Sequence, residues 1–321
     1  MSDARYVTDY FSTHAAQWVA GAYGSDPCPP QYPVGAHRVR LALTTLAKRF
    51  SIPDDLLDLG CGGGELCLAA AEAGWQAAGI DIAAGMIDEA KKKRAQLAEP
   101  LGSRVEFFHR DALKNECRAN SYGAVAALGL IEYMPEDAPL CREAYRVLKP
   151  GGVWIVSCRN RLFNLSSLNR YTEDELATGQ AKVLLAELQS LVGERAIENT
   201  AWQAFLGRLS EMSPVFSQAL KADEEEARLA RSSARPPAFQ QDRRQHTPQA
   251  LWESARAAGF AEPMFLGVHP HPLPPAVEQS APRLYHALAR AFEVFEELPV
   301  SLVWSSAFLG VFVKPGAQGA R

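Results

Sequence analysis

A tight glycine-rich turn between an apolar run and an alanine-rich run is the feature that most limits how this chain can fold. The apolar run DLLDLG covers residues 55–60, and GELCLAAAEAG covers residues 64–74. The first run favours a buried strand, and the second favours a helix that ends at Gly74. A further apolar run, QAAGID, covers residues 76–81. The sequence therefore predicts a strand, a tight turn, a helix and a second strand that ends at the carboxylate of Asp81.

Strand-like and helix-like segments continue to alternate along the next part of the chain. Strands are predicted at 104–113, 122–134 and 153–159, with helices at 84–99 and 138–152. Alternation at this spacing is typical of a doubly wound parallel sheet in an α/β fold. Ligands of such sheets bind at the carboxyl ends of the strands, which is where the glycine-rich turn lies.

The spacing of the glycines indicates what kind of ligand the turn can accept. Gly60, Gly62 and Gly64 leave backbone N–H groups exposed at the start of the following helix. Glu65, however, stands where the dinucleotide-binding fingerprint has its third glycine, and a carboxylate is unfavourable beside a pyrophosphate. Asp81 is placed to accept hydrogen bonds from both hydroxyls of a ribose. A ligand with a ribose but without phosphates fits this pattern best.

Together with Asp58, Asp81, Met86 and the segment RDA at 110–112, the turn resembles the class I S-adenosylmethionine-dependent methyltransferases. The resemblance is to the small-molecule branch related to the ubiquinone-biosynthesis methyltransferases, and it covers roughly residues 35–160 and again 246–260. It implies a Rossmann-like, mostly parallel sheet of seven strands. It also implies S-adenosyl-L-methionine as cofactor and S-adenosyl-L-homocysteine as product.

The resemblance also assigns cofactor contacts. Arg38 resembles the arginine that some relatives direct at the methionine carboxylate, although Arg40 competes for this role. In relatives an N-terminal segment folds over the cofactor, and aromatic rings there would attract the sulfonium; a helix that only closes one edge of the sheet is an equal alternative. The predicted cofactor-binding residues are Tyr10, Phe11, Trp18, Arg38, Asp58, Gly60, Cys61, Gly62, Gly64, Asp81, Ile82, Met86, Asp111, Ala112 and Leu128.

Methyl transfer from a sulfonium needs few catalytic groups, because the methyl group is already activated. The protein mainly aligns an acceptor oxygen or nitrogen for in-line displacement and excludes water. A base would help a hydroxyl acceptor, whereas an amine could react by positioning alone. The catalytic candidates are His14, His269, His271 and Tyr133, and the candidate substrate contacts are Glu132, Tyr133, Arg159 and His246.

Some of these candidates also have a purely structural explanation. His269 and His271 alternate after the strand-like run MFLGV, and they are also explained as ordinary loop histidines. His246 precedes Thr247 and Pro248, a pattern that is mainly explained as the entry to a helix. Ile131-Glu132-Tyr133 stands where many relatives have Leu-Glu-His, so a role that needs histidine at 133 is not carried over.

The resemblance is interrupted by an insertion at residues 161–245. Apolar positions at helical spacing predict helices at 175–192, 197–209 and 214–233, followed by a polar linker. Because the insertion leaves the sheet at its carboxyl edge, we predict a helical lid over the substrate; packing against the core or a second subunit is the alternative. The predicted organisation is an N-terminal helical segment over the cofactor site (1–45), a core (46–160 and 246–315) and this insertion.

Charge and composition argue against several classes of protein. The 33 basic and 37 acidic residues give a net charge of −4, so no global field attracts nucleic acid. The N-terminus lacks the basic start and apolar run of a signal peptide, and the apolar stretch at 300–313 is too short to span a bilayer. We therefore expect a soluble, cytoplasmic protein without a nucleic-acid or membrane partner, possibly a homodimer. The six cysteines form no CxxC pair, so no metal is predicted.

The predicted function is transfer of a methyl group to an oxygen or nitrogen of a small-molecule metabolite. The apolar and aromatic insertion favours a lipophilic or glycosylated acceptor. Two other classes stay open: a nicotinamide-dependent oxidoreductase, against which Glu65 and the RDA segment argue, and a regulator that binds S-adenosylmethionine without catalysis. Binding of NADH would identify the first, and failure to form S-adenosylhomocysteine with any acceptor would identify the second.

Overall fold

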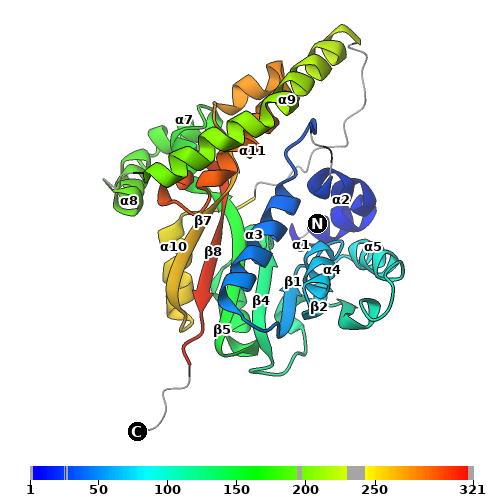
Figure 1. Cartoon of the computed structure of the whole chain (residues 1–321). Coiled ribbons are helices and arrows are strands. Elements are labelled where there is room, and N and C mark those ends of the chain that lie inside the picture. Colours follow the sequence, from blue (N-terminus) through cyan, green and yellow to red (C-terminus); the bar gives the residue numbers. More distant parts are fainter. Residues whose placement is uncertain (1–2, 25, 27, 194–196, 230–242, 317–321) are drawn as a thin grey trace.

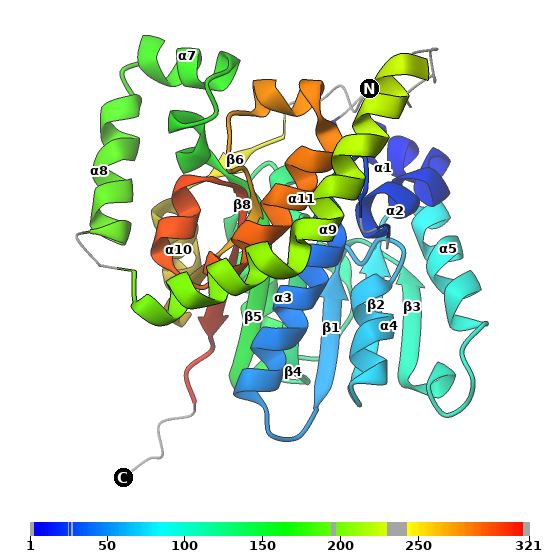
Figure 2. The same ribbon diagram turned by 45° about the horizontal axis from the view of Figure 1, so that its top comes forward.

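The alternating segments of the first half of the chain form the parallel strands of one sheet. The computed structural model describes residues 3–24, 26, 28–193, 197–229 and 243–316. Its strands are β1 (Asp55–Leu59), β2 (Gln76–Asp81), β3 (Val105–His109), β4 (Tyr122–Leu128), β5 (Leu148–Asn160), β6 (Gln245–His246), β7 (Ala261–Pro270) and β8 (Ser305–Val313). Their order is β3-β2-β1-β4-β5-β8-β7, and the short β6 pairs with the end of β5 (Figures 1 and 2).

The sheet is mostly parallel, as the resemblance implies. Strands β1 to β5 pair in parallel, whereas β8 runs antiparallel to both β5 and β7. Because the parallel strands share one direction, their carboxyl ends meet at one edge. The predicted Rossmann-like sheet of seven strands is confirmed, and the two-residue β6 is an addition to it.

Helices cover both faces of the sheet, and each face has its own buried cluster. On one face α3 (Val34–Arg49) and α4 (Glu65–Glu72) pack through apolar side chains such as Leu46 and Leu66. On the other face α6 (Ala138–Val147) packs on β4 and β5, and α10 (Pro248–Ala257) packs on β7 and β8. Helix α5 (Ala84–Arg94) packs beside β3. Strand residues alternate between the two clusters, because successive side chains of a strand point to opposite faces.

The glycine-rich turn connects β1 to α4 through a backbone that only glycine adopts easily. Gly60, Gly62 and Gly64 have φ values of 73°, 53° and 84°. A Cβ atom on Gly64 would also overlap the ring of Phe107. The backbone N–H groups of Gly60 and Cys61 donate to the carbonyl oxygen of Ile80, at 2.8 and 3.0 Å. The turn is therefore bonded to the end of the neighbouring strand β2.

The N-terminal segment forms two helices, α1 (Asp3–Thr13) and α2 (Ala15–Tyr23), which lie at the carboxyl ends of β1 and β2 (Figure 2). Helix α1 approaches α5 so closely that a Cβ atom on Gly85 would overlap the carbonyl group of Ser12. The next helix, α3, continues to Arg49 and therefore past the predicted boundary at residue 45.

The insertion contains α7 (Arg170–Ala177), α8 (Ala181–Val192) and α9 (Asn199–Leu229). The predicted break between 197–209 and 214–233 is wrong, because α9 is one helix with Pro214 inside it. Its side chains pack on α11 (Pro282–Phe292) on both sides of the proline. This packing outweighs the loss of one backbone hydrogen bond. The predicted polar linker and the end of the last predicted helix lie mostly outside the described residues.

Helix α9 is fastened to α11 by polar contacts as well. The Asp223 carboxylate accepts hydrogen bonds from the backbone N–H groups of Arg283 and Leu284, at 3.1 and 3.0 Å, and so caps the start of α11. The Arg283 guanidinium pairs with Glu226 and donates to the carbonyl oxygen of Cys28. In both views α9 runs along α11 (Figures 1 and 2). Most of the insertion is therefore anchored to the C-terminal part of the fold.

Short 3-10 helices complete the connections between the elements. The 3-10 helices are η1 (Gly102–Arg104), η2 (Ala112–Lys114), η3 (Ile131–Tyr133), η4 (Arg161–Leu165), η5 (Pro275–Ser280), η6 (Glu293–Phe295) and η7 (Pro299–Val303).

No helix in the described ranges has the length and apolar character needed to cross a lipid bilayer.

Lys314 stabilises the end of the sheet opposite to the turn. Its buried ammonium donates to the side chain of Asn120 at 2.7 Å and to the carbonyl oxygens of Tyr145 and Leu148, both at 2.8 Å. We expect Lys314→Met to lower the free energy of unfolding by about 2 kcal/mol, because it removes the donor from three acceptors, of which the Leu148 carbonyl oxygen is buried. Urea unfolding measures this change, with exposed Lys182→Met as control. Equal losses in the two variants would contradict the assignment.

Candidate active site

A cavity of about 720 Å³ lies at the carboxyl ends of the parallel strands, under α1 and α2. Its wall combines the glycine-rich turn, the ends of β2, β4, β5 and β7 and the start of β8. Most of the site residues predicted from the sequence line it. These are Tyr10, Phe11, His14, Trp18, Arg38, Gly60, Gly62, Asp81, Ile82, Met86, Leu128, Glu132, Tyr133, Arg159, His269 and His271.

Asp81 is held in place by the backbone of the turn. One carboxylate oxygen accepts from the N–H of Gly62 at 2.9 Å, and the other accepts from the N–H of Ala83 at 2.8 Å. Burial raises the pKa of Asp81 despite these hydrogen bonds. The carboxylate is thus oriented by two donors and keeps lone pairs that face the cavity side of the turn.

Arg38 and Arg40 differ sharply in their surroundings. Arg38 lines the cavity, and its buried Nε has no hydrogen-bond partner among the described residues. It lies so close to Gly129 that a Cβ atom there would overlap the guanidinium. Arg40 instead pairs with Glu293 and Glu296 at 3.0 and 2.5 Å, away from the cavity wall. Of the two, only Arg38 is placed to meet a ligand in the cavity.

Aromatic rings from the N-terminal helices form the cover of the cavity. The Phe11 ring meets the edges of Trp18 and Tyr133, with centroids 5.7 and 5.5 Å away. Tyr10 stacks on His14 at 4.7 Å, and His14 Nδ1 donates to the carbonyl oxygen of Tyr10. This hydrogen bond leaves the lone pair on Nε2 of His14. The N-terminal segment therefore contributes both apolar faces and one possible proton acceptor.

Several predicted cofactor residues lie behind the cavity wall rather than in it. Asp58 is only 3% exposed, and burial together with the Asp81 and Glu65 carboxylates raises its pKa to about 8. Cys61 is buried next to the turn, and Asp111 caps η2 by accepting from the N–H of Leu113 at 2.8 Å. The predicted residues outside the wall are Asp58, Cys61, Gly64, Asp111, Ala112 and His246. For the first five a direct contact with the cofactor stays a prediction, and for His246 a contact with the substrate stays one.

His246 has a structural role in the described chain. Its Nε2 lies 2.9 Å from the carboxylate of Asp137, which Arg244 also contacts. Thr247 then caps α10 by accepting from the N–H of Ala250, as the helix-entry explanation predicts. His246 therefore joins β6 to the loop before α6 and does not line the cavity.

His269 and His271 lie together on the wall opposite to the turn. Their ring centroids are 4.2 Å apart, and Tyr32 stacks on His269 at 4.2 Å with an interplanar angle of 12°. His269 has a φ of 56°, which few non-glycine residues adopt. Ser306 contacts its Nδ1 at 3.1 Å. Such strain is found where the surroundings fix a side chain for a function.

The hydrogen bonds of His271 define its tautomer. The Tyr285 hydroxyl donates its one proton to the carbonyl oxygen of Leu273 at 2.6 Å and lies 2.8 Å from His271 Nδ1. Nδ1 must therefore carry the proton, and the lone pair is on Nε2, which has no hydrogen-bond partner in the described chain. Burial lowers the pKa of His271 to about 4, with Glu278 opposing and His286 adding to the shift.

His269 is held neutral in the same way. Burial lowers its pKa well below the usual range, and His271 and His286 contribute to the shift. Its Nε2 is buried and, like that of His271, has no partner in the described ranges. Both imidazoles are therefore neutral at pH 7.

The wall of the cavity also includes residues that the sequence did not single out. Phe163, Tyr171 and Arg243 come from the insertion, and Tyr32 comes from a proline-rich segment. None of these segments has a periodic pattern or a motif that marks a ligand contact. Helices α8 and α9 contribute no described residue to the wall, so only the first part of the insertion and its return segment line the cavity.

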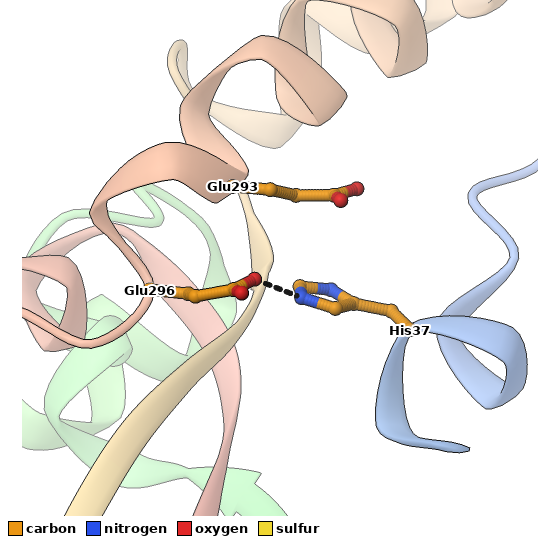
Figure 3. Close-up of side chains that lie close together, drawn as sticks. All are labelled: His37, Glu293 and Glu296. Atoms are coloured by element: carbon orange, nitrogen blue, oxygen red, sulfur yellow. Dashed lines mark hydrogen bonds and ion pairs between the residues drawn. The ribbon is translucent and has the colours of Figure 1, made fainter. Parts of the chain in front are cut away.

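A separate cluster offers three possible metal ligands, His37, Glu293 and Glu296 (Figure 3). His37 Nε2 lies 2.9 Å from Glu296, and the Tyr32 hydroxyl donates to Glu293 at 2.6 Å. Arg40 already binds both carboxylates, and with His37 it lowers the pKa of Glu296 against the effect of burial. The cluster is thus explained as an ion-pair network between α3 and η6, and we assign no metal to it.

The fold and the site together define a Rossmann-like domain with a ligand cavity at the carboxyl ends of its parallel strands. Residues 56–152 match the family described as "Methyltransferase domain", which confirms the class inferred from the glycine-rich turn. Among curated proteins, the chain is 31% identical over 155 residues to the ubiquinone biosynthesis O-methyltransferase of Xanthomonas campestris pv. campestris (strain B100). That match covers 48% of this chain and only 60% of the relative's length.

Solved structures share the fold over nearly the whole chain. Magnesium protoporphyrin IX methyltransferase (ChlM) from Synechocystis PCC 6803, solved with bound SAH, has a TM-score of 0.54 and 15% identity over 98% of this chain and 100% of its own. The [4+2]-cyclase SpnF has a TM-score of 0.51 and 16% identity over 97% of this chain and 96% of its own. At these identities the likeness shows the fold alone, and one fold hosts different reactions.

The buried His271 makes stability depend on pH. Its pKa is about 4 in the folded protein and near 6.5 when unfolded, so the unfolded chain binds a proton first as pH falls. This contribution to stability is complete above pH 6.5 and is lost as pH falls towards 4. We expect wild type to lose up to about 1.4 kcal/mol per pH unit more than His271→Gln over this range. Urea unfolding at several pH values measures it.

The control for this comparison is Lys182→Met, because Lys182 is exposed and carries no group that titrates between pH 4 and 6.5. Its stability should follow the wild-type curve at every pH. Parallel curves for wild type and His271→Gln would contradict the neutral, buried state of His271.

Proposed function

We propose that this protein is an S-adenosylmethionine-dependent methyltransferase that acts on an oxygen atom of a small molecule. The proposal rests on one observation, which is that two walls with different chemical groups face one cavity. Asp81 and Arg38 lie on the turn side, and the neutral His269 and His271 lie on the other. The curated O-methyltransferase relative supports an oxygen acceptor.

The residues of the turn side fit the cofactor. Asp81 offers oriented carboxylate oxygens for the ribose hydroxyls, and Ile82 and Met86 offer apolar contacts beside it. Arg38, with its unpartnered buried Nε, would pair with the methionine carboxylate. Phe11 and Trp18 would face the sulfonium with their rings. Bound there, S-adenosylmethionine would supply an activated methyl group.

The chain's own residues would exclude water, take up the proton and orient the acceptor. The helices α1 and α2 cover the cavity and exclude water, which also prevents hydrolysis. His269 or His271 would accept the proton of the acceptor hydroxyl at Nε2, because this ring nitrogen has no hydrogen-bond partner among the described residues. Glu132 and Tyr133 lie between the two walls and orient the acceptor. Phe163 and Tyr171, from the start of the insertion, shape its far end.

The turn argues against a nicotinamide cofactor. Glu65 lies in the first turn of α4 and forms an ion pair with Lys93, whose ammonium also donates to the carbonyl oxygen of Gly63 at 3.1 Å. A carboxylate and its partner thus occupy the helix start that a pyrophosphate would need. A cyclase or a regulator with the same fold would bind the cofactor without forming S-adenosylhomocysteine, so product formation separates these functions.

Cofactor binding is the first test. We expect Asp81→Ala to weaken binding of S-adenosylhomocysteine at least about 100-fold, because two hydrogen bonds from ribose hydroxyls to a carboxylate are lost. Calorimetry with wild type, Asp81→Ala and exposed Asp88→Ala measures the effect, and thermal unfolding confirms that each variant is folded. Tight binding of NADH, or undiminished binding by folded Asp81→Ala, would overturn the proposed cofactor site.

The histidine pair is tested by turnover. We expect the double variant His269→Gln/His271→Gln to lower kcat about 100-fold or more with a panel of small phenols, because proton transfer is lost. Its affinity for S-adenosylhomocysteine should stay unchanged, and exposed His109→Gln should match wild type. Formation of labelled methyl product measures the rate. An unchanged rate would show that positioning alone suffices, and no product with any phenol or amine would favour a non-methylating function.

A further inference from the structure

The acceptor end of the cavity carries an excess of positive charge. The ionised side chains in the wall are three arginines, Arg38, Arg159 and Arg243, and two carboxylates, Asp81 and Glu132. Arg159 lies at the end of β5, where its neighbours in the sheet are Gln245 and Ala307. Arg159 therefore lies in the part of the wall formed by the end of β5, β6 and the start of β8. We take this part as the acceptor end of the cavity.

Each of the other charges in the wall has a counterpart. Asp81 accepts two backbone hydrogen bonds from the turn. Glu132 is 4% exposed and lies 3.8 Å from the guanidinium of Arg243. Arg38 is the residue that the proposed function pairs with the cofactor carboxylate. These assignments leave Arg159 as the charge in the wall that still needs a counter-ion.

Arg159 is unusual among the arginines around it. Its guanidinium lies over the Tyr171 ring, 5.7 Å from the centroid, and forms no ion pair or hydrogen bond with any residue that the structure describes. By contrast, Arg161 pairs with Glu175 and Arg244 pairs with Asp137, both at 2.8 Å. The neighbouring arginines are thus used to hold the fold, and Arg159 is not.

The position of Arg159 is unfavourable for an unpaired cation. The side chain is half-buried, and burial together with the nearby Arg243 lowers its pKa although the Glu132 carboxylate opposes the shift. A charge in such a place costs free energy unless an anion compensates it. A guanidinium is also the group best suited to bind a carboxylate or phosphate with two parallel hydrogen bonds.

We propose that the methyl acceptor carries an anionic group, a carboxylate or a phosphate, that binds the guanidinium of Arg159 at the acceptor end of the cavity. This inference rests on the proposed function, because it treats the same cavity as the acceptor site. Arg159 is then a specificity-determining residue. It selects acidic acceptors and places their hydroxyl towards His269 and His271.

The test uses small anions as probes of the S-adenosylhomocysteine-saturated protein. Benzoate, phenyl phosphate and the neutral benzamide are titrated into wild type, Arg159→Gln and Arg159→Lys by calorimetry. We expect at least one anion to bind wild type about tenfold or more tightly than Arg159→Gln, with benzamide unchanged. Arg159→Lys should retain part of the difference. The stronger of benzoate and phenyl phosphate identifies the carboxylate or the phosphate.

The matched control is Arg170→Gln. Arg170 lies over the same Tyr171 ring, 4.8 Å from the centroid, but does not line the cavity. It should bind all three probes as wild type does. The inference is overturned if both anions bind wild type no more tightly than benzamide, fail to bind it, or bind Arg159→Gln equally well.

The same titrations on the cofactor-free protein separate this inference from the proposed function. If S-adenosylhomocysteine does not bind wild type, the proposed function fails, whereas Arg159-dependent anion binding would still identify the anion site. If S-adenosylhomocysteine binds and the anions do not, the proposed function stands and only the acidic acceptor is refuted.

Discussion

The hydrogen bonds between the glycine-rich turn and the end of β2 are the interaction on which the rest of the site depends. The Ile80 carbonyl oxygen accepts from Gly60 and Cys61, and the Asp81 carboxylate accepts from Gly62 and Ala83. The ends of β1 and β2 are thus joined by hydrogen bonds. These hydrogen bonds fix the starts of α4 and α5, and the joined strand ends form the floor of the cavity, against which α1 and α2 can pack.

The opposite wall depends on long-range contacts instead. His269 lies near the end of β7 and His271 directly follows this strand, and their positions are set by Tyr32, Ser306 and Tyr285, which come from distant parts of the chain. Because burial keeps both imidazoles neutral, this wall offers proton acceptors, whereas the turn offers a carboxylate and backbone donors. The cavity therefore has two chemically different sides, as a reaction between two bound molecules requires.

The parts of the site that local rules govern could be predicted from the sequence. Glycines at φ values above zero and a carboxylate at a strand end need only nearby residues, so the turn and Asp81 were predictable. The choice between Arg38 and Arg40 was not, because it depends on how α3 is rotated on the sheet. The continuity of α9 through Pro214 depends on packing against α11. Tyr32 and Arg243 lie in aperiodic segments, so only the folded chain brings them to the wall.

The two walls are connected by two successive residues of α3. Arg38 points into the cavity on the cofactor side, while the His37 imidazole accepts from the backbone N–H of His269 at 3.3 Å and is held by Glu296. A helix is stiff over one turn, so α3 links the group that would hold the methyl donor to the backbone of His269 at the end of β7.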